Sequence, residues 1–89
     1  MHVGNSDTYV NKNKLTSLDV SKNTKLLWLY AYGNELSELN INKNIYLTML
    51  YVNNNNLSSI NLNYNTKLEY LDLSDNQLTS INLSKNTAL

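Results

Sequence analysis

A repeat of 21 residues runs through most of the sequence and restricts the fold more than any other feature. Four positions of the repeat keep one kind of residue in register. They are Leu15, Leu36, Leu57 and Leu78; Leu18, Leu39, Ile60 and Ile81; Val20, Ile41, Leu62 and Leu83; and Asn23, Asn44, Asn65 and Asn86. A fixed period of about 20 to 50 residues is typical of solenoids and other repeat folds. The spacing predicts a chain wound into coils, one coil for each repeat.

A second copy of the motif lies inside each repeat. Its positions are Leu26, Leu47, Leu68 and Leu89; Leu29, Leu50 and Leu71; Ala31, Val52 and Leu73; and Asn34, Asn55 and Asn76. Both copies read L-x-x-L-x-φ-x-x-N, where φ is apolar. Apolar and polar residues alternate within them, as in a half-buried strand. We expect two short strands per coil, facing away from each other across a thin leucine core, little or no α-helix, and asparagines that bond to main-chain groups at the turns.

The repeat also sets the expected limits of the folded unit. Residues 10–89 form one solenoid of about four repeats, whereas residues 1–9 are a frayed segment or a partial repeat, because Thr8 is a poor core residue. Neither end resembles a polar cap, and an uncapped solenoid exposes its core and an open strand edge. We therefore expect a fragment of a longer array, or end-to-end self-association.

The residues between the ladder leucines point outward, and the two resulting faces differ. One is small and polar, with Ser17, Asp19, Glu38, Asn40 and their equivalents, and we interpret it as a solvated side. The other gathers most of the large aromatic side chains, which are favoured binding anchors. The predicted partner-binding residues are Tyr9, Trp28, Tyr30, Tyr32, Met49, Tyr51, Asn53, Tyr70 and Asp72. The alternative is that these rings only stabilise neighbouring strands.

Motifs for catalysis or metal binding are missing from the sequence. His2 is the only histidine, cysteine is absent, and only Gly4 and Gly33 supply glycine. These residues cannot build a nucleophile–histidine pair, a zinc site or a phosphate loop. We expect no enzyme activity, no cofactor and no metal.

Charge and hydropathy exclude two further classes of partner. Lys and Arg together number 7 and so do Asp and Glu. Such a balance lacks the basic footprint of a nucleic-acid binder. No apolar run approaches the roughly 20 residues that cross a bilayer, and no signal peptide is visible.

The segments Leu26–Leu36, Leu47–Leu57 and Leu68–Leu78 read L-x-x-L-x-φ-x-x-N-x-L, which resembles the leucine-rich-repeat consensus. The nested form is similar to the 21-residue repeats of internalin-J-like bacterial surface proteins. This resemblance implies a right-handed solenoid with parallel strands on its concave side, location outside the cell or on its surface, and adhesion to a protein ligand such as a host or cell-surface protein. Such repeats often carry cysteine where this chain has Ala31, Val52 and Leu73.

Two other functions stay open at this stage. Planar aromatics beside Asp72, Asn53 and Asn11 also suit sugar rings, so the face could bind a glycan. The coils could instead be structural spacers in a larger surface protein.

Overall fold

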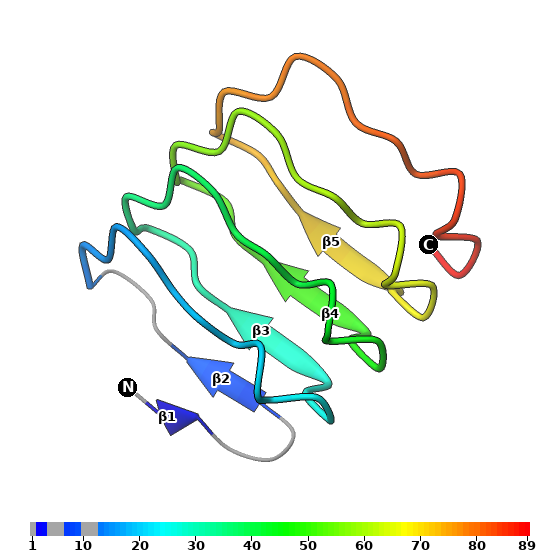
Figure 1. Cartoon of the computed structure of the whole chain (residues 1–89). Helices are drawn as coiled ribbons and strands as arrows, with labels where there is room; N and C mark the ends of the chain where they lie inside the picture. The colour runs from blue at the N-terminus through cyan, green and yellow to red at the C-terminus, as the bar shows by residue number, and fades with distance from the viewer. Residues whose placement is uncertain (1, 4–6, 10–12) are drawn as a thin grey trace.

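The computed structural model is a stack of coils joined by one five-stranded sheet (Figure 1). It describes residues 2–3, 7–9 and 13–89. The strands lie side by side in sequence order and are β1 (His2–Val3), β2 (Asp7–Tyr9), β3 (Trp28–Tyr30), β4 (Met49–Tyr51) and β5 (Tyr70–Asp72). Val10, where we expect the solenoid to begin, and Asn11 lie outside the described residues.

The strand register reproduces the sequence repeat. From β2 to β5 the strands are parallel, and each residue lies opposite the residue 21 positions later, as Leu29 does opposite Leu50 and Leu50 opposite Leu71. β1 differs because it runs antiparallel to β2, with His2 opposite Tyr9. The predicted winding of one coil per 21 residues is confirmed, as is the solenoid fold.

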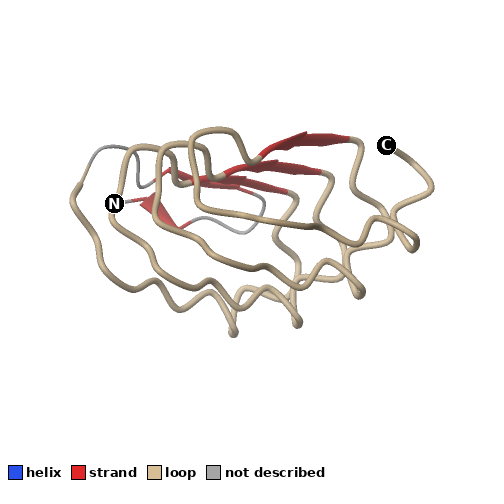
Figure 2. Ribbon diagram, turned by 90° about the horizontal axis from the view of Figure 1, so that it is seen from above, coloured by secondary structure: helices blue, strands red, loops and turns tan. Residues whose placement is uncertain are grey.

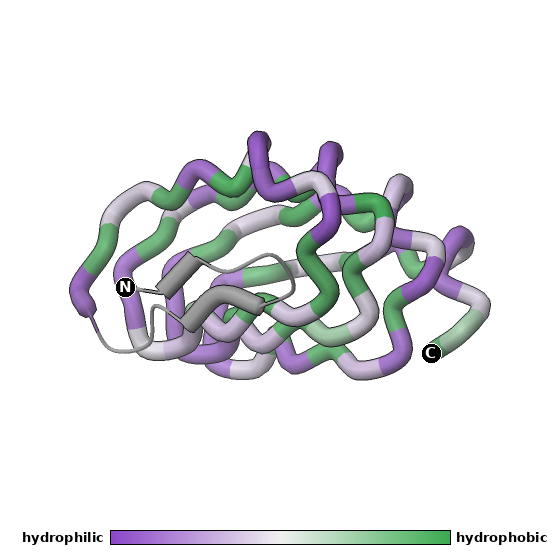
Figure 3. Tube along the Cα trace, turned by 90° about the horizontal axis from the view of Figure 1, so that it is seen from below, coloured by the Kyte–Doolittle hydropathy of each residue, from purple (hydrophilic) through white to green (hydrophobic). Residues whose placement is uncertain are grey.

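Both copies of the motif contribute to one thin core. The molecule measures 32 × 31 × 17 Å, and apolar stretches recur at matching places in successive coils (Figure 3). Each fully buried aliphatic side chain contributes about 1.5–3 kcal/mol. The buried apolar residues are Val20, Leu26, Leu29, Ala31, Leu36, Leu39, Ile41, Leu47, Leu50, Val52, Leu57, Leu62 and Leu68. In the last coil, Ile81 and Leu83 are 40% and 41% exposed because no coil of this chain covers them.

The prediction of strands on both sides of each coil is wrong for the second side. Within the described residues, strands form on one side only, and the opposite side is irregular (Figure 2). There, side chains take up the backbone groups: Asp19 Oδ1 accepts from the Ser21 N–H at 2.9 Å, and Asn40 Oδ1 does the same for Asn42 at 2.9 Å. Short polar residues favour such turns over strand pairing, whereas the Trp, Tyr and Met side chains of β3 and β4 favour strands.

Asparagines follow each strand and bind two coils together. We call Asn34, Asn55 and Asn76 the post-strand ladder. The Nδ2 atom of Asn55 donates to Ala31 O (2.9 Å) in the previous coil and to Val52 O (3.0 Å) in its own coil. Its Oδ1 accepts from the Leu36 N–H at 3.1 Å. The expected bonds between turn asparagines and the main chain are therefore present.

A second set of asparagines lies before each strand. In this pre-strand ladder (Asn44, Asn65 and Asn86), Nδ2 of Asn65 donates to Ile41 O at 3.0 Å and to Asn44 O at 2.9 Å. The Oδ1 atoms of all three are buried and receive no hydrogen bond within the described part of the chain. The two ladders therefore hold the stack together to different degrees.

The left-handed backbone position of the repeat lies one residue before the post-strand ladder. Gly33 (φ 70°), Asn54 (φ 58°) and Asp75 (φ 55°) occupy it. Glycine has no side chain to clash there, and asparagine and aspartate tolerate this region better than other residues. We expected the ladder asparagines themselves to supply this tolerance, but they act through their side chains.

Candidate functional site

Three columns of side chains cover the outer side of the sheet, each running across successive coils. The first holds Trp28, Met49 and Tyr70, and the second holds Tyr30, Tyr51 and Asp72. The third follows the strands, where Gly33 N donates to Asn53 O (3.0 Å) and Asn54 N to Ser74 O (3.0 Å). We call these columns the aromatic face, which comprises Trp28, Tyr30, Tyr32, Met49, Tyr51, Asn53, Tyr70, Asp72 and Ser74.

The structure thus brings together eight of the nine predicted binding residues. For the ninth, Tyr9, it describes the backbone, which lies opposite Tyr30 and extends the second column by one coil. Trp28 and Tyr70 are the most open members, with 40% and 56% of their surface exposed. Burial of Leu29 and Leu50 on the other side of the strands forces these neighbours outward.

Contacts within the aromatic face fix its rings. The rings of Tyr30 and Tyr51 lie 5.2 Å apart at 52°, a tilted geometry typical of favourable aromatic pairs. Tyr30 Oη donates to Met49 Sδ at 2.8 Å, linking the second column to the first. Binding to such rings costs little side-chain entropy, because they are already held in place.

A shallow hollow of about 360 Å³ lies within this face, between Tyr32, Tyr51, Asn53 and Asp72. Asp72 Oδ1 accepts from Ser74 Oγ (2.6 Å) and from Ser74 N (3.0 Å). These bonds, the side-chain one first, lower the pKa of Asp72 below its usual value and keep the carboxylate charged. The hollow therefore places a negative charge beside two aromatic rings.

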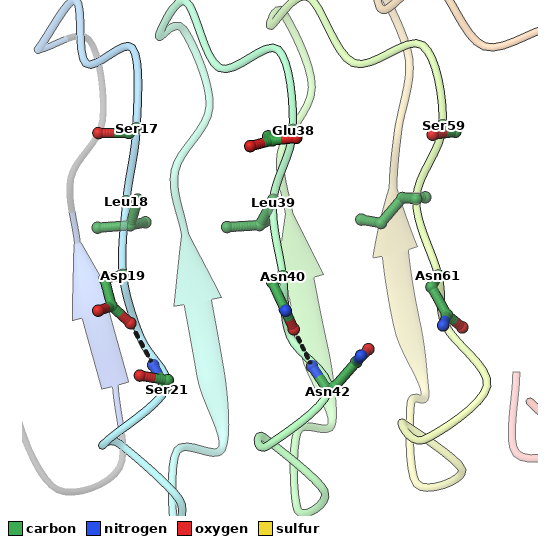
Figure 4. Close-up of a pocket in the computed structure, with 11 residues that line it drawn as sticks. Ser17, Leu18, Asp19, Ser21, Glu38, Leu39, Asn40, Asn42, Ser59 and Asn61 are labelled. Atoms are coloured by element: carbon green, nitrogen blue, oxygen red, sulfur yellow. Dashed lines mark hydrogen bonds between the residues drawn. The ribbon is translucent and has the colours of Figure 1, made fainter.

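The polar face contains a larger groove, of about 570 Å³, that the sequence did not indicate (Figure 4). Leu18, Leu39 and Ile60 lie along it between polar columns. Figure 4 shows the Asp19 and Asn40 side chains turned back toward the main chain of Ser21 and Asn42. Because these acceptors already bind backbone donors and no ring lines the groove, we keep the aromatic face as the candidate site despite the smaller hollow.

Metal and membrane sites were searched for in the same residues. No group of three His, Cys, Asp or Glu side chains comes together in the part of the chain that the structure describes. That part also contains no helix long and apolar enough to cross a membrane.

Comparison with known proteins supports the repeat fold. The leucine-rich-repeat family model matches residues 67–87. A comparison with curated protein sequences gave no match. Among solved structures, the functional domain of InlJ from Listeria monocytogenes, which includes a cysteine ladder, is similar with a TM-score of 0.92 and 35% identity. The match covers 94% of this chain and 19% of that one.

One row of the core differs from the pattern of such repeats. This chain has no cysteine. Ala31 and Val52, where the resemblance leads us to expect cysteine, are fully buried, and Leu73 of the same row packs against the core. The row therefore keeps its packing role without thiol chemistry. In fold, repeat length and core pattern, the chain is a leucine-rich-repeat protein of the internalin-J-like type.

Proposed function

We propose that residues 10–89 are a non-catalytic solenoid module that binds a protein ligand through the aromatic face and serves adhesion at a cell surface. The single observation that supports this most is the set of columns with Trp28 and Tyr70 open to solvent and Tyr30 and Tyr51 paired. Aromatic anchors of this kind supply most of the binding energy of protein interfaces. Similarity to InlJ supports an interaction module rather than an enzyme, and surface or secreted location by analogy.

A glycan is the second candidate ligand. The hollow favours it, because Asn53 and Asp72 offer polar groups beside Tyr32 and Tyr51. Sugar rings stack on aromatic side chains while their hydroxyl groups form hydrogen bonds. A spacer role is the third candidate, in which the rings only stabilise the sheet.

Binding to an array of purified extracellular protein domains tests the proposal. Trp28→Ala combined with Tyr51→Ala should weaken any domain bound by the wild-type chain by more than about tenfold, since each hot-spot residue contributes about 2 kcal/mol or more. Glu38→Ala with Ser59→Ala, on the polar face, is the matched control and should bind like wild type. Circular dichroism should show the same fold for all three chains.

Three results would overturn the proposal. Equal binding by the aromatic-face variant and wild type would remove this face from the interface. Selective hits on a glycan array, without any protein hit, would assign the face to carbohydrate. Loss of the folded state in the aromatic-face variant would assign the rings to stability.

A further inference from the structure

We propose that the hollow between Tyr32, Tyr51, Asn53 and Asp72 receives an arginine side chain of the protein partner. This inference rests on the proposed function, because it places one contact of that interface. It commits to a guanidinium group on the basis of charge, ring placement and free acceptors around the hollow.

The charge of the hollow lacks a counterpart in this chain. Asp72 is the only charged residue in the three columns described above, and none of the columns contains a lysine. Both hydrogen bonds of its carboxylate are at Oδ1, and Oδ2 has no hydrogen-bond partner among the described residues. Asp72 is half-buried, so a docked partner would shield it further from water and strengthen its attraction for a cation.

The rings of the hollow favour a planar cation. Tyr51 lies directly opposite Asp72 in the neighbouring strand, and its ring is held 5.2 Å from Tyr30. A guanidinium group stacks on aromatic rings and is more weakly hydrated than the ammonium group of lysine. The same group can therefore contact the ring and the carboxylate together.

Asn53 supplies a second acceptor. Its backbone carbonyl accepts from Gly33 N (3.0 Å) and Asn55 Nδ2 (3.3 Å), whereas its side-chain amide has no hydrogen bond in the described part of the chain. Arginine carries several N–H donors in a rigid fork, and lysine carries one compact charge. Two acceptors beside two rings match the fork better than the point charge.

The test measures binding of acetyl-Gly-Arg-Gly-amide to the full chain by nuclear magnetic resonance. The backbone amide signals of Asn53, Asp72 and Ser74 should shift. Peptides with lysine or with citrulline, the uncharged analogue of arginine, should bind more weakly, citrulline by at least about tenfold because it lacks the charge. Equal binding of the arginine and citrulline peptides would overturn the assignment.

Two aspartate variants separate this contact from general electrostatics. Asp72→Asn should weaken the arginine peptide by at least about tenfold. It should keep the turn, because Asn40 forms the equivalent turn bond to Asn42 on the polar face. Asp19→Asn removes the same charge from the same kind of turn on the polar face and should leave binding unchanged. An equal loss in both variants would show non-specific attraction and overturn the proposal.

The same variants distinguish this inference from the proposed function. If Trp28→Ala abolishes binding of a protein domain and Asp72→Asn does not change it, the arginine contact is wrong and the aromatic face remains the interface. If neither changes binding, the proposed function fails. Shifts of the same amide signals by maltotriose, without shifts by the arginine peptide, would assign the hollow to a sugar.

Discussion

The rings of Tyr30 and Tyr51 lie 5.2 Å apart at 52°, although the residues are 21 positions apart in the sequence. They meet because each occupies the last position of a strand, in β3 and β4, and the strands pair in register. One turn of the solenoid thus converts a sequence period into a surface of stacked side chains. The same relationship places Tyr51 beside Asp72.

A double-mutant cycle should measure the energy of this ring pair. Tyr30→Leu and Tyr51→Leu remove the aromatic contact while keeping an apolar side chain. We expect a coupling free energy of about 0.5–1.5 kcal/mol, typical of tilted aromatic pairs, from urea unfolding of the four chains. Strictly additive losses would mean that the rings do not interact in solution.

The two asparagine ladders should differ in their contribution to stability. Asn55→Ala leaves the Ala31 and Val52 carbonyls and the Leu36 N–H without their partner. Asn65→Ala releases only carbonyls, because Asn65 Oδ1 accepts no hydrogen bond from the described residues. Each buried group left unpaired costs about 1–3 kcal/mol. Denaturant unfolding should show the larger loss for Asn55→Ala, and an equal or reversed order would contradict the proposed bonding.

The left-handed position should respond to its side chain in a defined order. Gly33→Ala should lower the free energy of unfolding by about 1–2 kcal/mol, because a Cβ atom clashes at φ 70°. Asn54→Gly should be neutral or slightly stabilising, since φ is already 58° there. Thermal unfolding of both variants checks this order, and a stabilising Gly33→Ala would be inconsistent with the backbone conformation.

Asp72 should titrate below the usual aspartate value of 3.8 because Ser74 binds its carboxylate through the hydroxyl and the backbone N–H. A lowered folded-state pKa means that the ionised group stabilises the fold above pH 3.8, and that this contribution is lost as the pH falls through the lowered pKa. Ser74→Ala removes the larger of the two causes and should raise the pKa of Asp72. Carboxyl-carbon resonances report it directly, with Asp19, whose pKa is lowered by Ser21, as the internal reference. An unchanged pKa of Asp72 in Ser74→Ala would contradict this cause.

The sequence predicted the winding, the core and the aromatic face, because these depend on which positions are apolar. Leu29, Leu50 and Trp28 lie where the 21-residue register places them. It did not predict that Asp19 and Asn40 would bind their own backbone and leave that side without strands. The alternation of apolar and polar residues is the same on both sides, and only the identity of the polar residues decides between turn and strand.

The features of the site that the sequence missed depend on distances between coils. The hollow arises where Tyr32 and Asn53 from the third column adjoin Tyr51 and Asp72 from the second. Nothing in a repeat pattern states how far apart such columns lie. The left-handed residues Gly33, Asn54 and Asp75 did carry a signal, because all three types tolerate positive φ, but the neighbouring invariant asparagine drew the interpretation one residue too far.

Insertion of one additional coil tests most directly whether the chain winds once every 21 residues with its rings on one face. A second copy of residues 47–67, inserted after Lys67, should raise the free energy of unfolding by adding a coil and its interface. The same copy without its Tyr51 equivalent moves the following side chains to the wrong face and should lower it. Equal stability of the two chains in denaturant unfolding would contradict the account.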